Sequence, residues 1–408
     1  MPPRGHYVGA RERRHVDSIG ASVRVVTGPE ATPDPTIKAG SVLLRLVAHN
    51  ASAIFGGGEI GTALLLRGLQ ERGHSVRMLM RNAALAERVA EYGIPVGVQH
   101  VRGDLMVADA FGLAGRFRQE HPDAVILTTF KRVVLTGSAA RMARVPFVVQ
   151  RIVLQGDTPA RGARYRFALR RFVDAIVLNA DAMRPAFVAG DPRLDARVHT
   201  ILDGVREPLR SAAPGSVRAE LGIPARAFVI GSVARLATQK RFDRLLRAMA
   251  LLPDDIHCII AGEGEALSSI REQAAALGMA DRVHLPGFRS DLGDVFAALD
   301  LFVLSSDREG LANAMLEAMM TGVPVVSTDV SGAREALDAT SGEEAAGIVT
   351  GFDEAELARA VAGLYDDRRA LAALGAAARS RAQRHFGAER FLDDWERLLR
   401  EGVRRART

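Results

Sequence analysis

The sequence has little that would support disulfide bonds, membrane spans or export. Its 408 residues include a single cysteine, so no disulfide can form within the chain. Cys258 lies in the apolar run Ile256-His257-Cys258-Ile259-Ile260, which indicates a buried strand and a packing role for the thiol. No uninterrupted apolar segment is long enough to cross a bilayer, and the start Met1-Pro2-Pro3-Arg4-Gly5 lacks the apolar stretch of a signal peptide. We therefore expect a cytoplasmic protein.

Motifs for metal, nucleic-acid and dinucleotide binding are also missing. There is no Asp-x-Asp motif and no His-rich cluster, so we expect no metal site. No helix-turn-helix, zinc-finger or aromatic RNA-binding pattern accompanies the basic residues, so nucleic acid is not an expected partner. Met78-Leu79-Met80-Arg81 stands where a dinucleotide-binding unit would carry an acidic residue, which argues against hydride transfer.

What the sequence does contain is enough material for two domains. A chain of 408 residues with 48% hydrophobic and 25% charged residues exceeds one ordinary core. Residues 1–40 are rich in Pro, Gly, Arg and Ser without periodicity, and predict a flexible leader. We assign residues 41–205 to a first domain, 206–385 to a second, and 386–408 to a helix that is free to return toward the first.

Strand-like and helix-like segments alternate along both domains. The strand-like runs are Val42–Val47, Ser75–Met80, Ala124–Thr128, Pro146–Val149, Ala175–Leu178, Phe228–Val233, His257–Ala261, Arg282–Leu285, Leu301–Leu304, Val323–Thr328 and Gly347–Val349. Strands that alternate with helices form parallel sheets through right-handed crossovers. The sequence therefore predicts an α/β fold of two doubly wound domains.

Positive charge is concentrated in the first half of the chain. The net charge of +6 divides into +11 for residues 1–200 and −5 for residues 201–408. Part of the excess lies in a segment that resembles a basic amphipathic helix, with Arg161, Arg164, Arg166, Arg170 and Arg171. Such a helix suits an anionic membrane surface or a phosphorylated acceptor, which would place the protein at the inner face of the membrane. The alternative is a solvated helix whose apolar side packs on its own domain.

Two glutamates mark the strongest candidate site. Glu309 follows an apolar strand, in a loop at the edge where open parallel sheets bind ligands. Glu317 lies about one turn inside the next helix among apolar residues, so we expect it to be buried and to have a partner. Backbone amides that suit an anion would stand at that helix start, at Leu311, Ala312 and Asn313. Carboxylates that accept hydroxyls beside a phosphate cradle indicate a sugar nucleotide.

Two further loops offer groups for phosphates. Arg235 and Lys240 follow a predicted strand of the second domain and would clamp a diphosphate, unless they are merely solvated loop charges. Gly57 and Gly58 follow the first strand of the first domain and open a helix, where the backbone can approach a ligand closely. A plain tight turn is the alternative for the glycines.

Taken together, residues 42–400 resemble the family 4 glycosyltransferases. The matching segments are Gly56-Gly57-Gly58, Gly231 to Lys240, Gly262-Glu263-Gly264, His284-Leu285-Pro286-Gly287-Phe288, Glu309 to Glu317, and Val330-Ser331-Gly332-Ala333-Arg334-Glu335. The resemblance implies the GT-B fold, in which two Rossmann-like domains face each other across a cleft that binds a nucleoside-diphosphate sugar. No cofactor other than this donor substrate is implied.

The resemblance also implies roles for the candidate residues. Arg235 and Lys240 would hold the diphosphate, Glu309 the hydroxyls of the transferred sugar and Glu317 those of the ribose. Gly310 and the amides of Leu311, Ala312 and Asn313 would contact sugar or phosphate, while Gly57 and Gly58 approach from the other domain. Arg235, Lys240 and Glu309 are the catalytic candidates.

One departure concerns the acceptor side. Many family members carry a histidine where this sequence reads Thr128-Thr129-Phe130-Lys131, so Thr128, Thr129 and Lys131 are the acceptor-side candidates here. The resemblance implies transfer to a hydroxyl of a glycan, a lipid-linked molecule or a small molecule, with retention and without a metal, in cell-envelope polysaccharide or glycoconjugate synthesis. Two alternatives are a non-catalytic sugar-nucleotide or glycan-binding protein and a sugar-nucleotide epimerase or hydrolase of the same fold.

Overall fold

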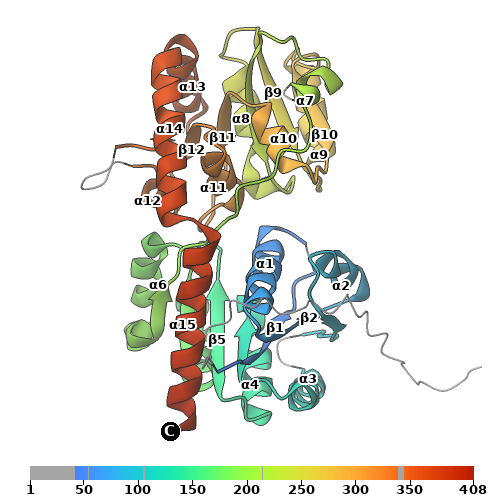
Figure 1. The fold of residues 1–408 in the computed structure, drawn as a ribbon, viewed down its shortest axis with the longest axis vertical. Coiled ribbons are helices and arrows are strands. Elements are labelled where there is room, and N and C mark those ends of the chain that lie inside the picture. The colour runs from blue at the N-terminus through green and yellow to red at the C-terminus, as the bar shows by residue number, and fades with distance from the viewer. Residues whose placement is uncertain (1–41, 54, 104–105, 214, 339–343) are drawn as a thin grey trace, which may run out of the picture.

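Two parallel sheets form the frame of the protein (Figure 1). The computed structural model describes residues 42–53, 55–103, 106–213, 215–338 and 344–408; the predicted leader at residues 1–40 lies outside them. The first sheet has the order β3-β2-β1-β4-β5-β6-β7 and the second the order β10-β9-β8-β11-β12-β13, and all their pairs are parallel. The expected pair of doubly wound α/β domains is confirmed.

The N-terminal domain contains the first sheet. Its strands are β1 (Arg45–Asn50), β2 (Ser75–Met80), β3 (Val96–Val98), β4 (Ala124–Leu127), β5 (Phe147–Ile152), β6 (Ala175–Leu178) and β7 (Val198–Thr200). Its helices are α1 (Gly57–Glu71), α2 (Ala83–Ala90), α3 (Val107–Glu120), α4 (Val133–Met142), α5 (Ala163–Phe172) and α6 (Arg184–Gly190). Short 3-10 turns are η1 (Phe130–Arg132), η2 (Pro159–Arg161), η3 (Asp181–Met183) and η4 (Pro192–Arg197).

The C-terminal domain contains the second sheet. Its strands are β8 (Phe228–Val233), β9 (Ile256–Ala261), β10 (Val283–Gly287), β11 (Leu301–Leu304), β12 (Val325–Thr328) and β13 (Ile348–Thr350). Its helical segments are α7 (Ser216–Glu220), η5 (Thr238–Lys240), α8 (Phe242–Met249), α9 (Leu267–Ala276), α10 (Leu292–Ala297), α11 (Asn313–Met320), α12 (Ala333–Leu337), α13 (Glu354–Asp366) and α14 (Arg368–His385). The last helix is α15 (Ala388–Arg407). Within the ranges described, no helix is both long and apolar enough to span a bilayer.

The strands are apolar because both faces of each sheet are covered. In β1, Val47 belongs to one apolar cluster while Leu46 and Ala48 belong to another. Burial on two faces explains why these strands read as continuous apolar runs. Two strands of three residues, β3 and β7, were too short for this pattern and were not predicted, and β1 begins at Arg45 rather than Val42.

The last helix packs on the N-terminal domain although the chain enters it from the C-terminal domain. In Figure 1, α14 lies on the upper domain and α15 continues from it along the lower one. The indole of Trp395 is fully buried in a cluster with residues of β1, β2 and α1. Where the chain crosses back, Val205 pairs with Gly387 and its N–H donates to the carbonyl of Phe386 at 2.8 Å. The two interdomain crossings therefore lie side by side.

The burial of Trp395 predicts that α15 is an integral part of the N-terminal core. Trp395→Ala should lower the free energy of unfolding by about 3–5 kcal/mol, because it removes a fully buried aromatic side chain and leaves a cavity. Urea unfolding followed by circular dichroism measures the change. Arg404→Ala, at an exposed position of the same helix, is the control and should change stability little. Equal effects of the two substitutions would contradict this packing.

Candidate active site

Two loops follow neighbouring strands of the C-terminal sheet and bring a cation and an anion together. Lys240 ends η5 after β8, and Glu309 lies in the loop after β11, the strand paired with β8. Nζ of Lys240 donates to Oε1 of Glu309 at 2.5 Å, and Oγ of Ser306 donates to the same oxygen at 3.0 Å. The side chains of Lys240 and Glu309 are 17% and 12% exposed, so water screens the pair only weakly.

Arg235 reaches from the C-terminal domain toward the glycine loop of the other domain. Its guanidinium pairs with the exposed carboxylate of Glu265 at 3.1 Å. A Cβ atom at Gly56 would lie 3.8 Å from Nε of Arg235, which places the guanidinium beside the start of α1. Gly57 and Gly58 are the first residues of α1, and a Cβ atom at Gly57 would meet nothing within 4 Å. The predicted phosphate-binding groups of both domains therefore lie at one place.

Gly310 lies in the loop between β11 and α11, residues 305–312, which we call the donor loop, and it packs tightly against the N-terminal domain. A Cβ atom there would lie 2.2 Å from Oδ1 of Asn179 and 2.6 Å from the carbonyl oxygen of Val153. Such distances exclude a side chain, so glycine is required by the contact rather than by its backbone conformation. Asn179 follows β6 and Val153 follows β5.

The start of α11 faces the first turn of α1. The Leu311 and Ala312 side chains are buried, and α11 has no side-chain cap. No acceptor among the described residues takes a hydrogen bond from the backbone N–H groups of Leu311, Ala312 or Asn313. The amide of Asn313 lies 3.3 Å from where Gly61 would carry a Cβ atom, and Oδ1 of Asn313 is buried without a partner. Unpaired N–H groups at a helix start are an anion-binding arrangement.

Glu317 has a carboxyl group that is difficult to ionise. Burial of this group raises its pKa to about 7, while the residue as a whole is half-buried. Within the described part of the chain its side chain forms no hydrogen bond or ion pair, so the expectation of a protein partner was wrong. Its charge also acts on Tyr92 of the N-terminal domain. Burial raises the pKa of the Tyr92 hydroxyl, and the negative charges of Glu91 and Glu317 raise it further. A desolvated carboxyl without a partner is costly, and a ligand with hydroxyl groups would supply the missing donors.

A buried polar network connects the glycine loop to the donor loop. Nη2 of Arg151 donates to Oδ1 of Asp203 at 2.7 Å, and these side chains are 3% and 6% exposed. Nη1 of Arg151 donates to the Thr62 hydroxyl at 3.0 Å, in α1. Nδ2 of Asn179 donates to Oδ2 of Asp203 at 2.7 Å and to the carbonyl of Leu311 at 3.5 Å. The network fixes α1 against the loop that carries Glu309.

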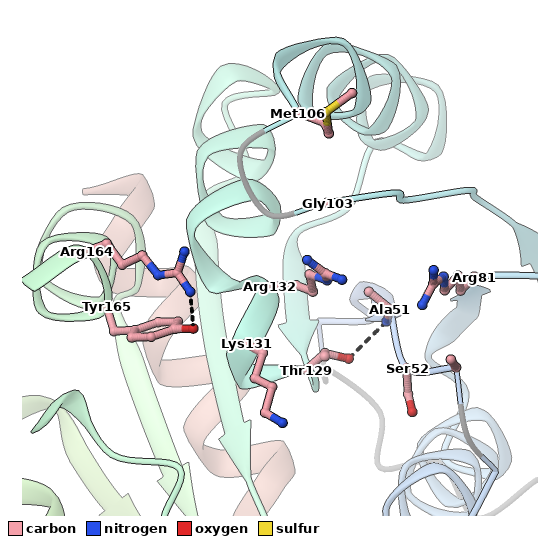
Figure 2. A pocket seen from close by; sticks show the side chains of 11 residues that line it. Ala51, Ser52, Arg81, Gly103, Met106, Thr129, Lys131, Arg132, Arg164 and Tyr165 are labelled. Carbon is pink, nitrogen blue, oxygen red and sulfur yellow. Dashed lines mark hydrogen bonds between the residues drawn. The ribbon is translucent and has the colours of Figure 1, made fainter. Parts of the chain in front are cut away.

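A cavity of about 630 Å³ lies in the N-terminal domain at the carboxyl ends of β1, β2 and β4 (Figure 2). Thr129 and Lys131 line it, and the Thr129 hydroxyl accepts a hydrogen bond from the N–H of Ala51 at 3.0 Å. Thr128 is not among the described lining residues, because its hydroxyl donates to the carbonyl of His49 at 3.2 Å. Two of the three acceptor-side candidates therefore reach the cavity.

The five arginines near α5 do not form one free basic face. Arg161 lies in η2 before the helix and pairs with Asp157 at 2.5 Å. Arg170 forms two hydrogen bonds to Asp191, which lower the pKa of that carboxyl. The remaining three are Arg164, which lines the cavity, Arg166, which donates weakly to the carbonyl of Pro159, and Arg171, which is exposed.

Several residues of this region could not be identified in the sequence. Arg151 carried a signal, a charged residue within an apolar strand, whereas Tyr92 and Asn179 stand in segments with no motif. Among the described residues no three His, Cys, Asp or Glu side chains come together as metal ligands. The region is thus built from cations, helix-start amides, two carboxylates and a separate cavity, as suits an anionic ligand with several hydroxyls.

Two protein families match the two domains. Residues 56–201 match "Glycosyl transferase 4-like domain" and residues 216–381 match "Glycosyl transferases group 1". The chain is 39% identical over 175 residues to the lipopolysaccharide core biosynthesis mannosyltransferase LpsB of Rhizobium meliloti, which covers 41% of this chain and 49% of that protein. The chain thus spans about half the length of this relative.

Longer matches agree with this result. The D-inositol 3-phosphate glycosyltransferase of Kineococcus radiotolerans is 30% identical over 299 residues, covering 66% of this chain and 67% of that protein. The crystal structure of Anabaena HepE in complex with UDP-glucose aligns with a TM-score of 0.76 at 23% identity, covering 88% of this chain and 100% of that one, and shows the same fold. This chain belongs to the family 4 glycosyltransferases, of the glycosyl transferases group 1, and has the two-domain GT-B fold.

Proposed function

We propose that the protein transfers a sugar from a nucleoside-diphosphate sugar to a hydroxyl acceptor, with retention at the anomeric carbon and without a metal ion. The observation that carries this proposal is the Lys240–Glu309 pair beside the unpaired helix-start N–H groups of α11. The functions of similar proteins, such as lipopolysaccharide core synthesis, support a role in cell-envelope polysaccharide or glycoconjugate synthesis.

The donor is proposed to lie with its diphosphate between the two domains. Arg235 and Lys240 contact the phosphates as cations, and the start of α11 adds N–H groups and the helix dipole. The Lys240 ammonium has three N–H donors, of which Glu309 takes one, so the lysine can hold the carboxylate and a phosphate oxygen together. Glu309 would then present its oxygens to the sugar hydroxyls, and Glu317 to the ribose.

Transfer would proceed by attack of the acceptor on the same face from which the diphosphate leaves. The bond from the anomeric carbon to the phosphate oxygen breaks, the bond to the acceptor oxygen forms, and the acceptor proton moves to the leaving phosphate. Arg235, Lys240 and the helix-start amides stabilise the charge that develops on the diphosphate. Oε1 of Glu309 already accepts from Lys240 and Ser306, so a second-carboxylate mechanism of the glycosidase kind is a poor fit.

The proposal predicts that Lys240→Ala lowers kcat by about 10²-fold or more, because it removes a cation from the leaving diphosphate. The assay incubates the protein with UDP-sugars and candidate acceptors in a chelator, and NMR determines the anomeric configuration of the product. Wild-type product should form in the chelator and keep the donor's configuration.

Arg226→Ala, at an exposed position of the same domain, is the matched control and should turn over like the wild type. Wild-type rates in Lys240→Ala, or loss of activity in the chelator, would contradict the mechanism. Donor consumption without an acceptor would favour an epimerase or hydrolase. Donor binding without turnover on any acceptor would favour a binding protein.

The pKa of Glu317 predicts a pH dependence of donor binding. With a pKa raised to about 7, the carboxyl is ionised above that pH and protonated below it, and only the ionised form can accept from both ribose hydroxyls. The Kd for UDP should rise by up to about tenfold as the pH falls from about 8 to about 6. Titration calorimetry measures it. Glu317→Gln should bind weakly and without this dependence, whereas exposed Glu272→Gln should keep it.

We also propose that the exposed side of α5 contacts an anionic membrane. Phe167 is 59% exposed, and Arg171 on the same helix is exposed. Binding to vesicles with anionic lipid should exceed binding to neutral vesicles, because apolar insertion and charge attraction act together. A Phe167→Ser, Arg171→Gln variant should lose the difference in a flotation assay. Equal retention of the wild type by both kinds of vesicle would remove the proposal.

A further inference from the structure

Several positive charges line the cavity of the N-terminal domain. Four cationic side chains line it, Arg81, Lys131, Arg132 and Arg164, and no acidic residue is among the described lining residues. Figure 2 shows Arg81 and Arg132 on either side of Ala51, with Lys131 below Arg132 and Arg164 farther to the left. Arg81 follows β2 directly, and Lys131 and Arg132 belong to η1. Three of the charges are thus placed just after the ends of strands, and the fourth, on Arg164, is placed by helix α5.

These four cations differ from the other arginines of the same domain. None of them forms an ion pair with a carboxylate of the described residues. Arginines nearby do so regularly, as in Arg102–Asp109, Arg141–Asp174, Arg161–Asp157 and Arg170–Asp191. Arg164 donates to the Tyr165 hydroxyl at 2.8 Å, which leaves its charge uncompensated. Like charges around a hollow repel one another, and an anion bound there would relieve the repulsion.

The cavity adjoins the donor loop. Burial raises the pKa of Asp157, and the positive charges of Arg161, Lys131 and Arg308 act in the opposite direction. The charges of Lys131, in the cavity, and of Arg308, the residue before Glu309, thus both act on the carboxylate of Asp157. Ser52 and Ala53, also in the lining, lead into the glycine loop. A molecule in the cavity would extend toward the sugar of a donor held at Glu309.

We propose that this cavity binds a phosphate group carried by the acceptor, so that the acceptor is a phosphorylated molecule. A phosphate offers several oxygens to more than one guanidinium, and its double charge suits four cations better than a single carboxylate would. That the phosphate belongs to an acceptor rests on the proposed function, whereas the anion site rests on the cavity alone.

Titration calorimetry of the full-length protein with inorganic phosphate tests the anion site. The wild type should bind phosphate saturably, and Arg81→Gln and Arg132→Gln should each raise the Kd by about tenfold or more, because each removes a charged hydrogen-bond donor. Neither side chain forms a hydrogen bond or an ion pair with another described residue, so both variants should melt like the wild type. Arg171→Gln makes the same charge change on the same domain and should bind phosphate unchanged.

Three results would overturn the proposal. The first is the absence of saturable phosphate binding by the wild type. The second is an equal loss of phosphate affinity in Arg171→Gln and Arg132→Gln. The third is a loss of phosphate affinity in Lys240→Ala that Arg132→Gln does not share. The last would place the anion in the donor site. Transfer activity in a protein that fails to bind phosphate would reject this proposal alone. Phosphate binding that needs Arg81 and Arg132, in a protein without transfer activity, would reject the proposed function alone.

Two further probes identify what carries the phosphate. Glucose 6-phosphate should bind at least about tenfold more tightly than glucose, and Arg132→Gln should abolish the difference; equal binding of both sugars by the wild type would contradict an acceptor-borne phosphate. Vesicles of phosphatidylcholine with phosphatidic acid test a lipid source. Retention that Arg132→Gln abolishes indicates a lipid-borne phosphate, and glucose 6-phosphate binding without such retention indicates a soluble one.

Discussion

The buried ion pair between Arg151 and Asp203 holds together the parts of the molecule on which the site depends. Arg151 lies near the end of the central strand β5, and Asp203 lies in the segment between the two sheets. Through Thr62 and Asn179 the pair also fixes the first helix and the carbonyl of Leu311. A buried charge left alone is strongly destabilising, so the pair acts as a unit that is either complete or disrupted. Its geometry thereby determines how the glycine loop and the donor loop face each other.

The sequence was sufficient for most of the fold because its strands are buried on both faces. Such strands appear as unbroken apolar runs, and nine of the eleven predicted runs needed at most small changes of boundary. The two exceptions are β1, where Val42 and Leu43 proved exposed, and β5, which continues to Ile152. The end of β5 was not predicted because Arg151 lies inside the strand, and a charged residue in a sequence usually indicates the beginning of a loop.

The meeting of Lys240 with Glu309 was more predictable than the lining of the cavity, for a physical reason. Lys240 and Glu309 follow adjacent parallel strands, and the carboxyl ends of such strands always open on one edge. The lining of the cavity in the N-terminal domain depends instead on which way side chains turn after a strand. Thr128 turns back to the His49 carbonyl while Thr129, one residue later, reaches the cavity, and no periodicity distinguishes the two. The charge of Glu317 acts on Tyr92 because the two domains face each other, and the sequence carries no sign of this proximity.

The paired crossings at Val205 and Gly387 constrain how the domains can move. The chain passes between the domains twice, and both passages are fastened together at one point, where the backbone of Gly204 packs directly on Phe391. A rotation about that point keeps the fastening intact, while a slide of one domain past the other would have to break it. Any rotation of one domain about this contact would therefore keep the loop that carries Glu309 on a constant line relative to the cavity of the N-terminal domain.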